Sequence, residues 1–207
     1  MSSQADFVVR DIGVPVRGVN WVQLIVGKDL SGRECLYAVM GQQADNLFVL
    51  QIDPLKGTFH QAVAPGSGSN YPTTAIWGKD DRLYIGAAWS GRLLCFDPRK
   101  GSIEDLGAIN PPHDTFPCRI DNAPDGSLFI GSYDSASLTR CDPKTREFRR
   151  YGRCDEVDMY CYPLVGPDGI VACQIGSTTS QVVLVDPKTG EKKKVGPVVR
   201  AGEPGKS

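Results

Sequence analysis

The residues whose side chains are best suited to catalysis lie near position 115. His113 follows two prolines and precedes Asp114, and a histidine titrates near neutral pH, so it can act as a general base or acid. The competing interpretation is a solvent-exposed loop histidine. Arg119 begins a β-prone run, where a guanidinium is costly unless a carboxylate pairs with it. That carboxylate would belong to a ligand or to Asp121 or Asp134.

A second set consists of aromatic residues that fall at or beside predicted loops. Aromatic faces next to polar donors suit sugar rings, which present apolar C–H faces and hydroxyl edges, but aromatic residues are also ordinary packing between sheets. Two tyrosines of the set can also move protons, so we consider Tyr71 and Tyr133 together with His113 and Arg119 as catalytic candidates. The ligand-binding candidates are Trp89, Asp114, Asp134, Tyr160 and Tyr162.

The elements that must position these residues follow from a repeat. The Asp-Pro pairs at Asp53, Asp97, Asp142 and Asp186 lie 44, 45 and 44 residues apart. A period near 45 over four copies predicts a β-propeller. Asp-Pro-x-x-Gly suits a type I turn followed by a residue with positive φ, so each pair closes a hairpin and is a poor candidate for catalysis.

Each repeat reads as four short strands separated by Gly, Asp, Ser and Pro turns. The fold class is therefore all-β, a propeller of four-stranded antiparallel blades with about four blades present. We expect a lead-in over 1–19, blades over about 20–65, 71–107, 116–152 and 160–197, and a tail over 198–207.

The number of blades in the whole ring stays open. The segment Phe7 to Ile12 resembles an outer strand, and propellers commonly close by letting such a segment complete the last blade. A closed ring of four blades is one interpretation. We prefer an incomplete ring of six to eight blades, because the fourth repeat already has its own outer strand. In either ring, the loops that carry the candidates emerge at one end of the blades and the Asp-Pro turns at the other.

The composition and charge of the chain limit the classes of partner that we expect. The 207 residues carry a formal net charge of −1, and the run of lysines at 192–194 is expected on an exposed edge strand, so nucleic acid is not an expected partner. No apolar run reaches the roughly 20 residues of a membrane span, and no signal region begins the chain, which predicts a cytoplasmic protein without a membrane partner. Seven cysteines form no C-x-x-C pair, so we expect buried free thiols and no metal site. The cofactor is left unknown.

The repeat "DGSLFIGSY…LTRCDPKTREFRRYG" resembles the propellers that include NHL repeats, virginiamycin B lyase, gluconolactonase-like proteins and uronate polysaccharide lyases. The resemblance implies a small-molecule or oligosaccharide ligand at the loop end, and a lyase acting on uronate glycans, with Arg119 neutralising the carboxylate. A non-catalytic protein- or glycan-binding scaffold is one alternative. Another is gluconolactonase-like hydrolysis, which needs a calcium cage, for example with Asp121, Asn122 or Asp134.

Overall fold

The structure is a computed structural model that describes residues 19–42, 45–66, 68–112 and 115–200. These residues form sixteen strands in four antiparallel sheets, each with its strands in chain order. The segment Phe7 to Ile12, expected to be an outer strand, lies outside the described residues, as do His113 and Asp114. No helix long and apolar enough to cross a membrane occurs in the part of the chain that the structure describes.

Each sheet is one blade. Blade 1 consists of β1 (Val19–Lys28), β2 (Glu34–Gln42), β3 (Phe48–Asp53) and β4 (Thr58–Val63). Blade 2 consists of β5 (Tyr71–Trp77), β6 (Leu83–Ala88), β7 (Arg92–Asp97) and β8 (Ser102–Ala108). Blade 3 consists of β9 (Phe116–Asn122), β10 (Leu128–Tyr133), β11 (Ser137–Asp142) and β12 (Glu147–Arg153). Blade 4 consists of β13 (Cys161–Val165), β14 (Val171–Ile175), β15 (Thr179–Val185) and β16 (Lys192–Arg200).

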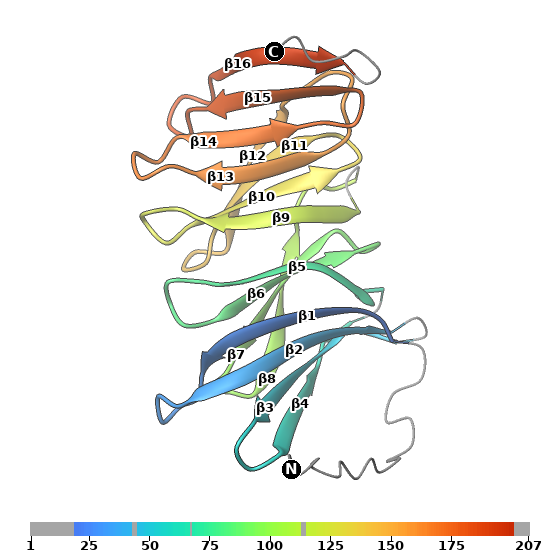
Figure 1. Ribbon diagram of the computed structural model, residues 1–207, viewed down its shortest axis with the longest axis vertical. Coiled ribbons are helices and arrows are strands. Elements are labelled where there is room, and N and C mark those ends of the chain that lie inside the picture. The colour runs from blue at the N-terminus through green and yellow to red at the C-terminus, as the bar shows by residue number, and fades with distance from the viewer. Residues whose placement is uncertain (1–18, 43–44, 67, 113–114, 201–207) are drawn as a thin grey trace, which may run out of the picture.

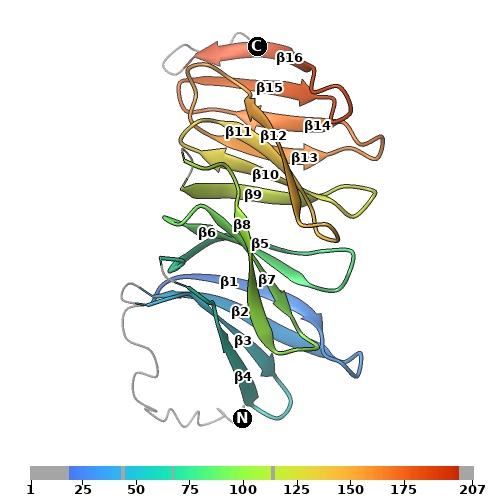
Figure 2. The same cartoon turned by 180° about the vertical axis from the view of Figure 1, so that it is seen from behind.

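The blades form an open array. Blade 1 and blade 4 lie at opposite ends of the molecule, and the same arrangement is seen from behind (Figures 1 and 2). The predicted all-β propeller of four-stranded blades is confirmed. The interpretation as a closed four-bladed ring is wrong for the described residues, because the first and last sheets do not meet.

The core lies between the blades. Every residue of β6 in blade 2 is buried, whereas every residue of the outer strand β12 is partly or fully exposed. The middle strand β6 is therefore covered on both faces by neighbouring blades. A close approach recurs at each interface: a Cβ on Gly41, Gly86 or Gly131 would lie within 2.9 Å of a proline of the following blade. These prolines, one in each following inner strand, are Pro72, Pro117 and Pro163.

The Asp-Pro turns share one geometry. The N–H of the residue four positions after each aspartate donates to the aspartate carbonyl oxygen at 2.7–2.9 Å. That residue has positive φ in all four turns, and it is glycine in three and Arg146, with φ of 63°, in the fourth. The aspartate carboxylate also accepts from the N–H two positions on, as Asp97 does from Arg99 at 2.9 Å. The repeated aspartates are therefore used by their own turns.

Candidate functional site

Aromatic rings gather at the loop end of blades 2 and 3. Tyr71 begins β5, Trp89 follows β6, and Phe116 begins β9. The ring of Phe116 lies 6.3 Å from that of Tyr71 and 5.8 Å from that of Trp89, measured between centroids. Tyr71 and Trp89 are themselves 6.3 Å apart. Three rings from two blades thus contact one another.

The ring contacts continue into blade 4. Tyr133, the last residue of β10, lies 5.9 Å from Phe116 edge to face and 4.7 Å from Tyr160. Tyr160 stacks on Tyr162 at 6.0 Å with the ring planes 8° apart. We call these six residues the aromatic array: Tyr71, Trp89, Phe116, Tyr133, Tyr160 and Tyr162.

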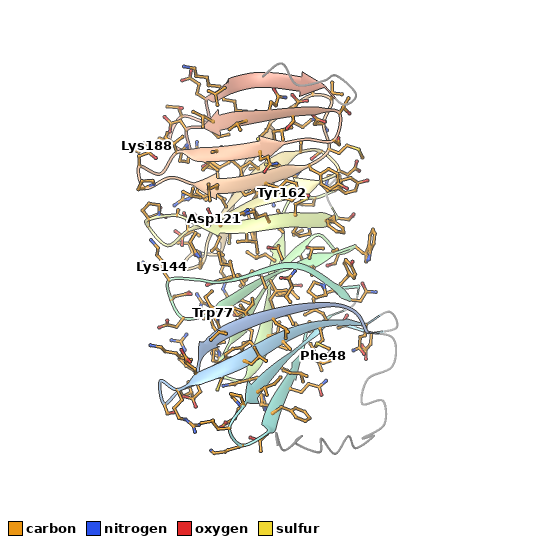
Figure 3. The ribbon with its side chains drawn as sticks, viewed as in Figure 1. Phe48, Trp77, Asp121, Lys144, Tyr162 and Lys188 are labelled. Atoms are coloured by element: carbon orange, nitrogen blue, oxygen red, sulfur yellow. The ribbon has the colours of Figure 1, made fainter. Side chains whose placement is uncertain are left out.

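Strand ends hold the array in place. Tyr133 and Tyr160 form an antiparallel bridge that joins the end of β10 to the approach to β13. Tyr162 stands on β13, the inner strand of blade 4, and is labelled in Figure 3. Because the rings sit at the ends of β5, β9, β10 and β13 rather than in long loops, the blade packing fixes their spacing.

Trp89 is the most exposed member of the array. Its side chain is 62% exposed, while the other five residues are partly buried. Its φ is 64°, in the left-handed region that a bulky side chain rarely adopts. Residues held in such conformations cost about 1–3 kcal/mol and cluster at binding and catalytic sites. Positive φ also occurs at Arg146 in an Asp-Pro turn, so the exposure of the Trp89 ring, rather than its backbone, marks this residue as a candidate contact for a ligand.

Arg119 does not have the protein partner that the sequence analysis allowed. It lies on β9 opposite Gly131 and is exposed, and among the described residues it makes no ion pair. Asp121, one expected partner, instead accepts the N–H of Val165 at 2.7 Å through Oδ2. The guanidinium of Arg119 thus remains available to a ligand.

The residues proposed for a calcium cage are not brought together. Asp121 and Asn122 end β9 at the turn end of blade 3, whereas Asp134 is exposed in the loop after β10, beside the other end of β9. Asn122 also donates through Nδ2 to the carbonyl oxygen of Trp77 at 2.9 Å. An extended strand therefore separates Asp121 and Asn122 from Asp134, and these three side chains do not form one cage.

The loop 154–160 is held by its own aspartates. Asp155 is buried and accepts from the N–H of Val157 and from Nζ of Lys194. Burial opposes its ionisation, but the hydrogen bonds from Lys194 and the backbone outweigh it and lower the pKa of Asp155. Asp158 is fully buried and accepts from the N–H and the hydroxyl of Ser177 at 2.9 Å. Both carboxylates therefore position the loop that carries Tyr160.

A cleft of ≈ 390 Å³ lies at the other end of blades 3 and 4. Its lining includes Phe129, Arg140, Pro167 and Lys188. Lys188 belongs to an Asp-Pro turn and lies at the left edge of Figure 3, with Tyr162 further to the right. None of the catalytic or ligand-binding candidates from the sequence analysis lines this cleft, so it is separate from the aromatic array.

Sequence reasoning found five members of the array and missed Phe116. Phenylalanine has no polar group, so nothing in its type distinguished it from a core residue. The signal that could have found it is positional, because "YPT" at Tyr71 and "FPC" at Phe116 occupy the same place in successive repeats.

No protein-family model matches the chain, and no curated protein matches it in sequence. Solved structures do resemble it. Virginiamycin B lyase from Staphylococcus aureus has a TM-score of 0.64 at 12% identity over 84% of this chain and 59% of that chain. A putative 6-phosphogluconolactonase from Bacteroides uniformis has a TM-score of 0.60 at 15% identity, covering 86% and 55%.

An auxiliary nutrient binding protein from Bacteroides thetaiotaomicron has a TM-score of 0.52 at 16% identity, covering 86% of this chain and 41% of that chain. This chain spans less than two thirds of the length of each of these three proteins. At such identities the likeness establishes the fold alone. The chain has the β-propeller fold, in agreement with the resemblance seen in its repeats.

Proposed function

We propose that the loop end of blades 2 to 4 binds a carbohydrate-like ligand on the aromatic array. The observation that carries this proposal is the unbroken series of ring contacts across three blades, which ends in the exposed, strained Trp89. Aromatic faces pack against the C–H faces of sugar rings, and their polar tips remain able to bond hydroxyl groups. The nutrient binding protein among the structural neighbours is in keeping with a small ligand.

The charge at the site favours an acidic sugar. Arg119 is exposed on β9, the strand that begins with Phe116, and it makes no ion pair among the described residues. A guanidinium recognises a carboxylate through two parallel hydrogen bonds, a geometry that a uronate can satisfy. The ligand class we propose is therefore an oligosaccharide that contains uronate residues.

Calorimetric titration tests binding. The chain would be titrated with tetragalacturonate, tetramannuronate and cellotetraose as a neutral reference. We expect a uronate tetramer to bind, and Trp89→Ala and Tyr133→Ala each to weaken it at least tenfold, about 1.4 kcal/mol. Phe59→Ala is the matched control, since Phe59 is 67% exposed on the outer strand β4 of blade 1. Equal affinities in all three variants, or no binding by the wild type, would refute the proposal.

A finer proposal is that the site cleaves its ligand as a lyase. Such a reaction needs a group that neutralises the uronate carboxylate, a base for the adjacent proton and an acid for the leaving oxygen. Arg119 would neutralise the carboxylate, and Tyr71 or Tyr133 would handle protons. His113 keeps its predicted role only as a hypothesis, since it lies outside the described residues.

Ultraviolet absorbance of unsaturated products, measured with and without a chelator, tests the lyase role. Arg119→Ala should abolish turnover while Tm stays unchanged, and chelation should have no effect. Full activity of the Arg119 variant would remove that residue from the mechanism. Saturable binding without product would identify a non-catalytic scaffold, and activity lost to the chelator would favour a lactonase-type mechanism instead.

A further inference from the structure

Three thiols converge between blades 3 and 4. The Sγ atoms of Cys154, Cys161 and Cys173 all lie within 4.8 Å of one another. Cys154 follows β12 of blade 3, Cys161 begins β13, and Cys173 lies in β14 of blade 4. Cys161 and Cys173 are fully buried and Cys154 is 5% exposed, and all three are free thiols. The set therefore joins two blades.

The other interfaces show what normally fills the position of Cys154. In each of the first three blades, the residue after the outer strand donates its N–H to the carbonyl oxygen of the residue at or next to the start of the third strand. The pairs are Ala64 to Leu47 at 2.8 Å, Ile109 to Gly91 at 2.9 Å and Cys154 to Ala136 at 2.9 Å. Alanine and isoleucine fill the position elsewhere, so a thiol is not required for the fold.

The position of Cys173 shows the same contrast. It is the third residue of the second strand in its blade, where blade 2 has Ile85 and blade 3 has Ile130. Each of these residues belongs to the buried cluster shared with the preceding blade. Cys154 and Cys173 thus each stand where other blades have an aliphatic residue, and both lie at the interface of blades 3 and 4. Cys161 adds a third sulfur at this interface. Buried cysteines that serve only as small hydrophobic residues would have no reason to converge.

The geometry suits a soft metal ion. A metal–sulfur distance of about 2.3 Å puts sulfur ligands about 3.8–4.0 Å apart, so only a small contraction is needed. Thiolates select Cu⁺ and Zn²⁺ among biological ions. Among the described residues, carboxylates and imidazoles do not join the three sulfurs. Three sulfur ligands without a fourth protein ligand favour Cu⁺ over a structural Zn²⁺ ion, which normally takes four.

An ammonium group beside the three thiols can balance the negative charge of such a site, and a buried amide lies on the same face of blade 4. Nζ of Lys192 donates to the carbonyl oxygens of Tyr151 and Arg153 at 2.6 Å, which places an ammonium group beside residue 154. Gln181 lies on the same face of blade 4, because its register partner Ile175 also pairs with Cys161. Its buried Oε1 has no hydrogen-bond partner among the described residues.

We propose that Cys154, Cys161 and Cys173 form a binding site for one thiophilic metal ion, Cu⁺ in the first instance, that links blade 3 to blade 4. The site is separate from the aromatic array and does not depend on the proposed carbohydrate ligand. Binding by thiolates releases protons and couples metal affinity to the stability of the interface.

Metal stoichiometry tests the site. The reduced 207-residue chain would be loaded anaerobically with Cu⁺, Zn²⁺ or Cd²⁺ in separate samples, desalted, and analysed for bound metal by mass spectrometry. We expect one ion per chain, and with Cd²⁺ a sulfur-to-metal charge-transfer band. At a free metal concentration 100 times Kd, we expect Tm to rise by about 5–10 °C.

Variants separate this site from adventitious binding. Cys154→Ala and Cys173→Ile install the residues that the other interfaces use, so both should fold and lose the stoichiometric ion, as should Cys161→Ser. Cys141→Ala is the control, because Cys141 is a buried free thiol outside the set, and it should retain one ion. Circular dichroism checks the fold of each variant. The proposal would be overturned if the wild type bound no metal after loading, or if folded Cys154→Ala and Cys173→Ile bound as much metal as the wild type. It would also be overturned if two of the three cysteines formed a disulfide and the chain bound no metal after that disulfide was reduced.

Discussion

The two ends of the blades use their side chains in opposite ways. At the turn end, charged groups bond their own turns: the carboxylate of Asp97 accepts from both the backbone and the guanidinium of Arg99. At the loop end, six rings contact one another and Arg119 is exposed without an ion pair among the described residues. The Asp-Pro turn repeats in all four blades, whereas the aromatic array draws its rings from blades 2 to 4.

The difference separates structure from function. Polar groups that are already hydrogen-bonded within their own turn stabilise that turn and have few hydrogen-bonding sites left for a ligand. Arg119 is exposed and makes no ion pair among the described residues, so it keeps that capacity. Changes at the Asp-Pro turns should therefore alter stability, and changes to Arg119 or to exposed rings of the aromatic array should alter binding.

The largest effect should come from acid, because it reaches several turns at once. Hydrogen bonds from backbone N–H groups lower the pKa of Asp53 and Asp186, and the side chain of Arg99 lowers that of Asp97. A carboxyl whose pKa is lowered by folding contributes stability that is present above its unfolded pKa, near 3.9, and lost as pH falls through the folded value. Urea unfolding at pH 5, 4, 3 and 2.5 should show a progressive fall in midpoint.

Asp97→Asn combined with Asp186→Asn is the control for this pH dependence. The double variant should start less stable at pH 5 and lose less on acidification, because two of the titrating groups are gone. A wild-type midpoint that stays level down to pH 2.5 would contradict the role given to the turn carboxylates.

An intermediate effect is expected at the turn between β5 and β6. The hydroxyl of fully buried Tyr84 donates to Oδ2 of Asp80 at 2.7 Å, and burial together with this bond raises the pKa of Tyr84. Asp80→Ala leaves the hydroxyl without that acceptor, which should cost about 1–3 kcal/mol of the free energy of unfolding. Calorimetry should show Tm lowered by about 3–10 °C with ligand affinity unchanged.

Asp81→Asn is the matched control for Asp80→Ala. Asp81 is exposed and has φ of 60°, a conformation that asparagine tolerates, so this variant should keep the wild-type Tm. If Asp80→Ala were as stable as Asp81→Asn, the turn end would not be the stability-determining end that we describe.

The smallest effect on stability should follow Trp89→Gly. Glycine adopts positive φ without strain, and this relief offsets the entropy that glycine adds to the unfolded chain. Thermal unfolding should show Tm within about 3 °C of the wild type, although ring contacts to Tyr71 and Phe116 are lost. Affinity for the uronate tetramer should still fall at least tenfold. A large loss of Tm would instead make Trp89 a packing residue.

The fold could be predicted because its signals are local. The Asp-Pro pairs repeat at nearly constant spacing, and each turn is specified by a few adjacent residues, as the positive φ of Gly57, Gly101 and Gly190 shows. Alternating strands and turns then follow from the same segment in each repeat. The openness of the array is a tertiary property, and the sequence analysis left two interpretations of it standing.

The site was predicted less completely because its relations are not local. The contacts that join Phe116 to Trp89 and Tyr133 depend on blade packing, which residue types alone do not reveal. Proximity along the chain is also a poor guide to proximity in space, since Asp121 and Asp134 are close in sequence but lie near opposite ends of β9. The three converging thiols have no recognisable spacing, because two blades supply them.

The bonds from Ala64 to Leu47, Ile109 to Gly91 and Cys154 to Ala136 have a further consequence. Each ties the segment leaving a blade to a loop of the same blade. In blades 2 and 3 these bonds constrain the backbone near Trp89 and Tyr133 before any ligand arrives. Association loses affinity when side chains and loops must be immobilised, at about 0.5–1.5 kcal/mol for each mobile side chain. A surface that is already ordered in the free protein loses less conformational entropy on binding, so a larger part of its contact energy appears as affinity.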